Sequence, residues 1–141
     1  VDAARHFGIG SVDLAFIDGD HRHPAPTLDL LALLYAMKPG TWVALHDIEL
    51  TSVAALAKSN DWGAVTGAEM LFKRWPFEKI QPQFEHPTCN NIGAIRLPMK
   101  LSLAAEFLLD LLEVQWETGQ IVPGEITRAL SLRRRLVAAA A

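Results

Sequence analysis

Side chains that could do chemistry follow two short apolar segments of the chain. Asp18 ends the first segment and His21 stands three positions later, while His46 and Asp47 end the second. Carboxylate oxygens suit a hard divalent cation such as Mg²⁺, and an imidazole nitrogen is a further common metal ligand. A neutral imidazole can also take a proton from a hydroxyl group near pH 7. We therefore interpret Asp18, His46 and Asp47 as candidate metal ligands and His21 as a candidate general base.

The same residue types also have a structural explanation, which the sequence leaves open. Carboxylates at strand ends often cap a following helix or accept hydrogen bonds from loop amides. A lone histidine in a loop is more often a surface residue than a base, and His23 has the same chemistry as His21 in a weaker position before a proline. His6 and His86 are not part of any such constellation, so we interpret them as structural or surface residues.

The elements that must position these side chains form one βαβ unit. Residues 12–18 and 42–47 predict two strands, because each contains a short apolar run of the kind found in parallel strands. Residues 26–37 predict the connecting helix, and Lys38-Pro39-Gly40 should end it. The carboxyl ends of parallel strands meet at one edge of a sheet, where open α/β folds bind their ligands. The two polar strand ends should therefore lie side by side.

The rest of the chain predicts further strands and helices around this unit. We expect a helix end at residues 1–7, helices at 52–59 and 67–75, strands at 77–81 and 92–97 with a loop between them, and helices at 101–116 and 123–138. This pattern predicts an α/β fold, divided into a domain at residues 1–98 and a helical tail at residues 99–141. Gly8-Ile9-Gly10 follows a helix and precedes a strand, which is the reverse of a nucleotide-binding glycine loop.

The composition excludes several classes of protein. The chain has 141 residues, of which 50% are hydrophobic and 21% charged, so a disordered or collagen-like chain is excluded. The single cysteine, Cys89, excludes an internal disulfide, and a net charge of −3 argues against a broad nucleic-acid-binding face. No apolar stretch predicts a membrane span, and no secretory signal is visible. We therefore expect a cytoplasmic protein with neither nucleic-acid nor membrane partners.

Residues 12–48 resemble the second half of a class I S-adenosylmethionine (SAM)-dependent methyltransferase. The likeness rests on Phe16-Ile17-Asp18-Gly19-Asp20-His21, the leucine-rich helix, Lys38-Pro39-Gly40 and Val43-Ala44-Leu45-His46-Asp47. It looks like the methyltransferase domain 24 family, near the macrocin-type sugar O-methyltransferases. The resemblance implies a Rossmann-like, partial parallel sheet. The family's strand order is 3-2-1-4-5-7-6, and the strands of this chain would be those in the order 4-5-7-6, followed by the helical tail.

The resemblance also implies roles for the site residues. In metal-dependent members an Asp-x-x-His motif follows the fourth strand, where the Asp binds Mg²⁺ and the His is the proposed base. Carried over to this chain, Asp18 is a metal ligand, His21 the base and Asp47 the second ligand. SAM would be the methyl donor and a small-molecule hydroxyl the acceptor. His46 stands where the family often has Glu, which is a departure from its metal-binding pattern.

The resemblance finally implies an O-methyltransferase that is present here in part. The family's SAM site lies mainly in the half that precedes its fourth strand, so we expect this chain alone to bind SAM weakly or not at all. The first strand of this chain should then have an unpaired edge, which favours a homo-oligomer or pairing with a missing N-terminal half. Two alternatives stay open: a non-catalytic interaction module, and a metal-dependent hydrolase built on the same residues.

Overall fold

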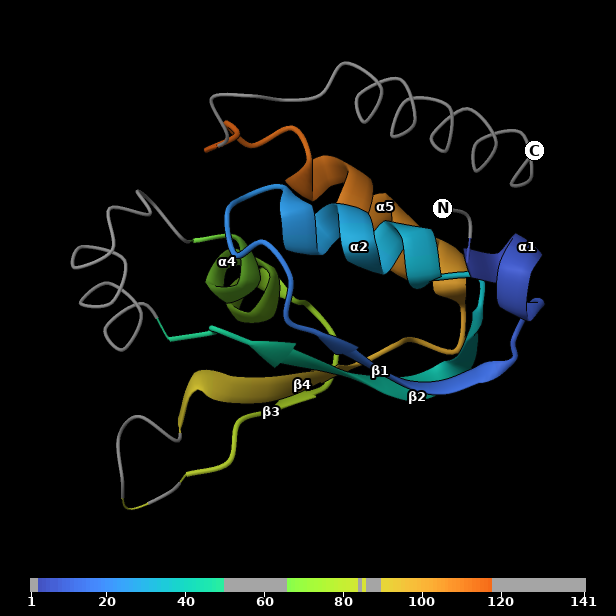
Figure 1. The fold of residues 1–141 in the computed structure, drawn as a ribbon, viewed down its shortest axis with the longest axis horizontal. Coiled ribbons are helices and arrows are strands. Elements are labelled where there is room, and N and C mark those ends of the chain that lie inside the picture. The colour runs from blue at the N-terminus through green and yellow to red at the C-terminus, as the bar shows by residue number, and fades with distance from the viewer. Residues whose placement is uncertain (1–2, 50–65, 84, 86–89, 118–141) are drawn as a thin grey trace.

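The computed structural model describes residues 3–49, 66–83, 85 and 90–117, which form a four-stranded sheet with helices (Figure 1). In chain order the elements are α1 (Ala3–Phe7), β1 (Val12–Ile17), α2 (Ala25–Leu33), β2 (Met37–His46), α4 (Gly67–Arg74), β3 (Lys79–Ile80), β4 (Ile92–Arg96) and α5 (Leu101–Leu111). The strand order is β1-β2-β4-β3. The fold is therefore mixed α/β, as the sequence predicted.

The strand order is also the one expected for a partial Rossmann-like sheet. β1 and β2 take the places of the fourth and fifth strands, and β4 lies between β2 and β3 as the seventh strand lies between the fifth and the sixth. β1 and β2 are parallel, whereas β4 runs antiparallel to both of its neighbours. Among the described strands one pair is parallel, and it is the pair that the βαβ unit supplies.

The parallel register brings two strand ends to one edge of the sheet. Ile17 of β1 pairs with Leu45 of β2, so Asp18 and His46 follow at neighbouring positions. α2 connects the two strands and packs on the sheet through Leu30, which is fully buried. The predicted βαβ unit is therefore present, and it places the polar strand ends together.

The connection between α2 and β2 differs from the prediction. α2 ends before Met37, which already pairs with Val12 at the start of β2. The next pair is Leu14 with Trp42, so β2 advances five residues where β1 advances two. The predicted turn at Lys38-Pro39-Gly40 is therefore an irregularity within the strand pairing, and its glycine has the positive φ of 77° that such a turn requires. Pairing with β1 outweighs the helical pattern of the preceding residues.

The remaining described elements fall within the expected ranges but are mostly shorter. β3 has two residues where a strand at 77–81 was predicted, and α5 ends at Leu111 instead of residue 116. The predicted helices at 52–59 and 123–138, and also Cys89 and His86, lie outside the described residues. None of the described helices combines the length and the apolar character needed to cross a membrane.

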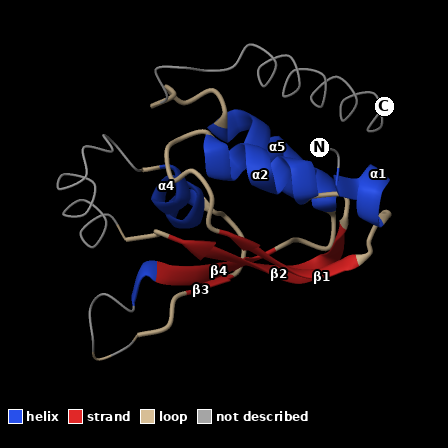
Figure 2. Cartoon of the chain, viewed as in Figure 1, coloured by secondary structure: helices blue, strands red, loops and turns tan. Residues whose placement is uncertain are grey.

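One face of the sheet carries the hydrophobic core (Figure 2). The buried side chains of Ile17, Val43, Leu45 and Ile95 lie on this face, and helices α2, α4 and α5 cover it. α5 contributes Leu108, which is 0% exposed. Although α5 lies in the stretch that we assigned to a helical tail, it packs into the same core as the strands. The division of the chain into two domains stays a prediction.

No described helix covers the opposite face of the sheet (Figure 2). Large apolar side chains are exposed on this face. Leu14 and Phe16 of β1 are 66% and 56% exposed, and Ile80 and Ile92 are 53% and 41% exposed. Among the described residues, β1 has a strand partner on one side only. The association with a second copy or another segment that we expected from this edge stays a prediction.

Leu108→Ala should lower the free energy of unfolding by about 2–5 kcal/mol, because it removes a buried side chain and leaves a cavity. Leu103→Ala on the same helix is the matched control. That side chain is 41% exposed, so its loss should cost no more than about 0.5 kcal/mol. Urea denaturation followed by circular dichroism measures both values, and equal losses would show that α5 does not belong to the core.

Candidate functional site

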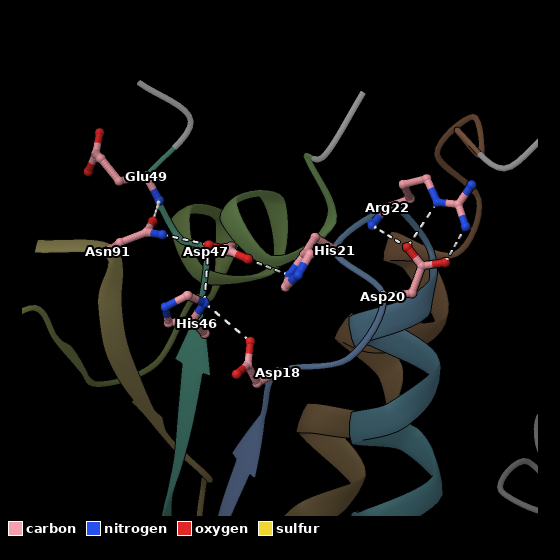
Figure 3. A network of polar contacts seen from close by, with 8 residues as sticks. All are labelled: Asp18, Asp20, His21, Arg22, His46, Asp47, Glu49 and Asn91. Carbon is pink, nitrogen blue, oxygen red and sulfur yellow. Dashed lines mark hydrogen bonds and ion pairs between the residues drawn. The ribbon is translucent and has the colours of Figure 1, made fainter. Parts of the chain in front are cut away.

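Three potential metal ligands converge at the carboxyl edge of β1 and β2 (Figure 3). Asp18 follows β1, His46 ends β2 and Asp47 comes next. Nδ1 of His46 lies 3.2 Å from Oδ1 of Asp18 and 3.1 Å from Oδ1 of Asp47. One ligand atom from each residue lies within 4.8 Å of the other two. The strand register thus brings together the three side chains that were predicted from the sequence as possible metal ligands.

The surroundings of His46 fit a shared cation. Its Nδ1 is buried and has no hydrogen-bond partner among the described residues, although two carboxylate oxygens are within hydrogen-bond distance. Neither oxygen therefore meets the angular requirement of a hydrogen bond. Neighbouring ligands of one octahedral cation, bound at about 2.1 Å, lie about 3 Å apart and point toward the ion instead of toward each other. The distances from Nδ1 of His46 to the two oxygens, 3.2 and 3.1 Å, have the spacing of such ligands.

His21 contacts the other oxygen of the Asp47 carboxylate. Its Nδ1 lies 2.5 Å from Oδ2 of Asp47, and the two side chains are 26% and 10% exposed. A carboxylate in this position fixes the tautomer and the orientation of the ring. With Nδ1 engaged, Nε2 is the nitrogen that remains for exchange of a proton with a third group. Asp47 therefore connects the candidate base to the other two candidate metal ligands, Asp18 and His46 (Figure 3).

Asn91, which was not among the predicted site residues, orients the Asp47 carboxylate. Its Nδ2 donates a hydrogen bond of 2.5 Å to Oδ1 of Asp47, and its Oδ1 accepts one of 3.0 Å from the backbone N–H of Glu49. The second bond fixes which end of the amide faces the carboxylate. Ile92 pairs with His46 in the antiparallel register, so the residue before β4 lies opposite the residue after β2. From the sequence, Asn91 was only part of the predicted loop between the strands at 77–81 and 92–97.

The backbone at Asp47 is in the left-handed region, with a φ of 59°, and it is the one non-glycine residue of the described part with a positive φ. This conformation costs about 1–2 kcal/mol for most L-residues, and Asp and Asn tolerate it best. Residues held in such conformations cluster at functional sites. The strain therefore agrees with a central role for Asp47 in this site.

Two nearby acidic residues, Asp20 and Glu49, lie outside the cluster (Figure 3). Asp20 accepts hydrogen bonds from Nε and Nη2 of Arg22 at 2.9 and 2.7 Å. These bonds hold the pKa of Asp20 below its ordinary value. Glu49 accepts a hydrogen bond of 3.2 Å from Nε2 of Gln81. Both carboxylates are engaged by partners of their own, and neither is among the candidate metal ligands.

His23 lies in the interior of the protein although it follows a polar loop. Its side chain is 0% exposed, and neither ring nitrogen has a hydrogen-bond partner of proper geometry among the described residues. Burial lowers the pKa of His23, because the charged ring would lose its hydration. His6, by contrast, is exposed on α1 and packs edge-on against Phe7. Neither histidine belongs to the cluster around Asp47.

The fold and this site define an α/β protein of the Rossmann-like class with a polar centre at the carboxyl edge of its parallel strands. Residues 1–48 match the family model of a methyltransferase domain, Methyltransf_24. The matched stretch contains β1, α2 and β2, together with Asp18, His21, His46 and Asp47. This part of the chain is therefore similar to a methyltransferase domain. No curated protein and no solved structure matches the chain.

The burial of His23 predicts that acidification destabilises the protein. The pKa of this ring is lower in the folded protein than the ordinary 6.5, so the unfolded chain binds the proton more readily. The neutral His23 ring therefore contributes fully to the free energy of unfolding above pH 6.5. This contribution is lost as the pH falls from 6.5 toward the lower pKa of the ring in the folded protein. Urea denaturation at about pH 7.5 and 5.5 measures the loss, which should be smaller in His23→Leu. His6→Leu is the control, and an unchanged loss in His23→Leu would contradict the assignment.

Proposed function

We propose that this chain supplies the general base and the metal site of a SAM-dependent O-methyltransferase that acts on a small-molecule hydroxyl. The methyltransferase-domain match supports the reaction class. One observation supports the roles of the base and the metal site. Nδ1 of His21 lies 2.5 Å from Oδ2 of Asp47, beside the Asp18–His46–Asp47 cluster. Methyl transfer to an oxygen requires removal of the hydroxyl proton, and a paired imidazole is suited to accept it.

In this proposal His21 accepts the acceptor's hydroxyl proton at Nε2. Asp47 keeps the ring oriented through Nδ1, and its negative charge stabilises the imidazolium that forms. Asn91 holds the carboxylate in place from the opposite side, through its hydrogen bond to Oδ1. The methyl group itself comes from SAM when SAM is bound. The described residues thus prepare the acceptor oxygen for its reaction.

Asp18, His46 and Asp47 hold the cation in this proposal. One imidazole and two carboxylates suit a first-row transition-metal ion such as Mn²⁺ better than Mg²⁺, which prefers oxygen ligands alone. We therefore propose Mn²⁺ as the preferred cation, in place of the Mg²⁺ that the family resemblance implies. A bound cation supplies positive charge that orients the acceptor hydroxyl and stabilises its alkoxide.

The described residues do not offer a SAM site of the usual construction. Such a site needs a glycine-rich loop that leads from a strand into a helix. Within the described residues, Gly8 and Gly10 precede β1, and the loop from β1 to α2 contains a single glycine, Gly19. Residues outside those described must complete the SAM site of the proposed enzyme. The part that the structure describes would accordingly activate the acceptor.

Metal binding can be measured on the 141-residue chain by calorimetry with Mn²⁺ and Mg²⁺. We expect Mn²⁺ to bind more tightly than Mg²⁺. Asp18→Asn and His46→Ala should each weaken Mn²⁺ binding by at least about 10-fold, since the first removes the charge of a ligand and the second removes a ligand. Asp13→Asn is the matched control, because Asp13 lies in β1, which Asp18 follows, is 72% exposed and pairs with Lys38. Equal affinity in all four proteins would mean that the carboxylates only support the loops.

The reaction is tested with radiolabelled SAM and a panel of monosaccharide and phenol hydroxyls, using the polypeptide encoded by the complete reading frame. His21→Ala should lower kcat by about 10²–10⁴-fold, the usual value of a general base. His6→Ala removes an exposed imidazole elsewhere and should leave kcat unchanged. Metal-dependent hydrolysis without SAM would favour the hydrolase, and the absence of both reactions would favour a non-catalytic interaction module.

A further inference from the structure

The loop that carries His21 is tied to a residue far along the chain. The backbone N–H of His23 donates a hydrogen bond of 3.0 Å to Oε2 of Glu117, across 94 residues of sequence. In return, the backbone N–H of Glu117 donates a bond of 2.9 Å to the carbonyl oxygen of His23. Two reciprocal bonds therefore fix the segment after α5 against the end of this loop.

The same carboxylate also reaches the beginning of α4. The backbone N–H of Thr66 donates to Oε2 of Glu117 at 3.1 Å, and the Thr66 hydroxyl donates to Oε1. Thr66 is the N-cap residue of α4, and its side chain does not cap its own helix. Glu117 supplies instead the negative charge and the acceptor that a helix N-terminus favours. One carboxylate therefore joins the His21 loop to α4.

The start of α4 lies directly against the backbone of the loop. The N–H of Gly67 donates a bond of 2.8 Å to the carbonyl oxygen of His21. A Cβ atom at this position would come within 2.8 Å of backbone atoms of His21, Arg22 and His23. Only glycine permits this approach, so α4 forms a close support for the residue that carries the candidate base.

We propose that Glu117 is a positioning residue: it clamps the backbone of residues 21–23 to the start of α4 and thereby keeps the His21 ring on Asp47. Its significance for catalysis rests on the proposed function, in which His21 is the base. The clamp does not involve the candidate metal ligands, because Asp18, His46 and Asp47 are positioned by the ends of β1 and β2. Loss of the clamp should therefore affect His21 and spare the metal site.

The test compares Glu117→Ala with Glu117→Gln in the 141-residue chain with ¹⁵N-labelled histidine. The nitrogen signals are recorded at one fixed alkaline pH. In the native protein those of the His21 ring should be the signals of the Nδ1–H tautomer, whose N–H faces Asp47. Glu117→Ala should shift the ring toward the Nε2–H form that free imidazole side chains favour, with the Mn²⁺ affinity within about 2-fold of the native value. Glu117→Gln should restore the native signal, because its amide oxygen accepts both N–H groups and its amide nitrogen can donate to Thr66.

Glu106→Ala, an exposed position on α5, is the control for loss of a carboxylate from this part of the chain. In the methyl-transfer assay, Glu117→Ala should lower kcat by about 10–10²-fold, as expected for a misplaced catalytic group. Should Glu117→Ala fail to fold, Glu117→Asp withdraws the carboxylate by one methylene and should give the same ring shift.

If the His21 ring of Glu117→Ala or Glu117→Asp keeps the native nitrogen signal, Glu117 does not act as a clamp. A loss of Mn²⁺ affinity that parallels the change in the ring signal would also contradict the proposal. The ring signal needs no methyl transfer. It therefore separates failure of the clamp from failure of the proposed reaction, which His21→Ala tests by itself.

Discussion

The site depends on one buried carboxylate that three partners share. Asp47 contacts His21 through Oδ2, and His46 and Asn91 through Oδ1. A charged group that is mostly withdrawn from water is stable only where hydrogen bonds or opposite charges compensate the lost hydration. The three partners come from the loop after β1, the end of β2 and the residue before β4. The carboxylate therefore requires both the parallel β1–β2 pairing and the antiparallel β2–β4 pairing to be in place.

This dependence explains why part of the site could be predicted from sequence. Asp18 and His46 each end a short apolar run, and parallel strands joined by one helix must end at the same edge. Local pattern and this one topological rule were sufficient to place the two side chains together. The same reasoning could not show that the guanidinium of Arg22 engages Asp20, because nothing in the spacing indicates that contact.

The parts that sequence reasoning missed depend on contacts between distant segments. Asn91 meets Asp47 across 44 residues, and Glu117 meets His23 across 94. Neither pair has a local signal, since an asparagine in a turn and a glutamate after a helix are ordinary surface residues. The burial of His23 likewise depends on the packing of the chain's later helices. Met37 shows the opposite case, in which pairing with β1 overrides a helical pattern that the local sequence supports.

The contact between His23 and Glu117 has a consequence for the order in which the protein is made. A ribosome adds about 5–20 residues per second, so the partner of the loop is added several seconds after the loop itself. During that interval the nascent chain already contains β1, α2 and β2, and hence both strand ends. The loop between β1 and α2, however, still lacks its anchor. The site is therefore completed in two stages of synthesis, with the strand-end carboxylates available before the histidine beside them is held in place.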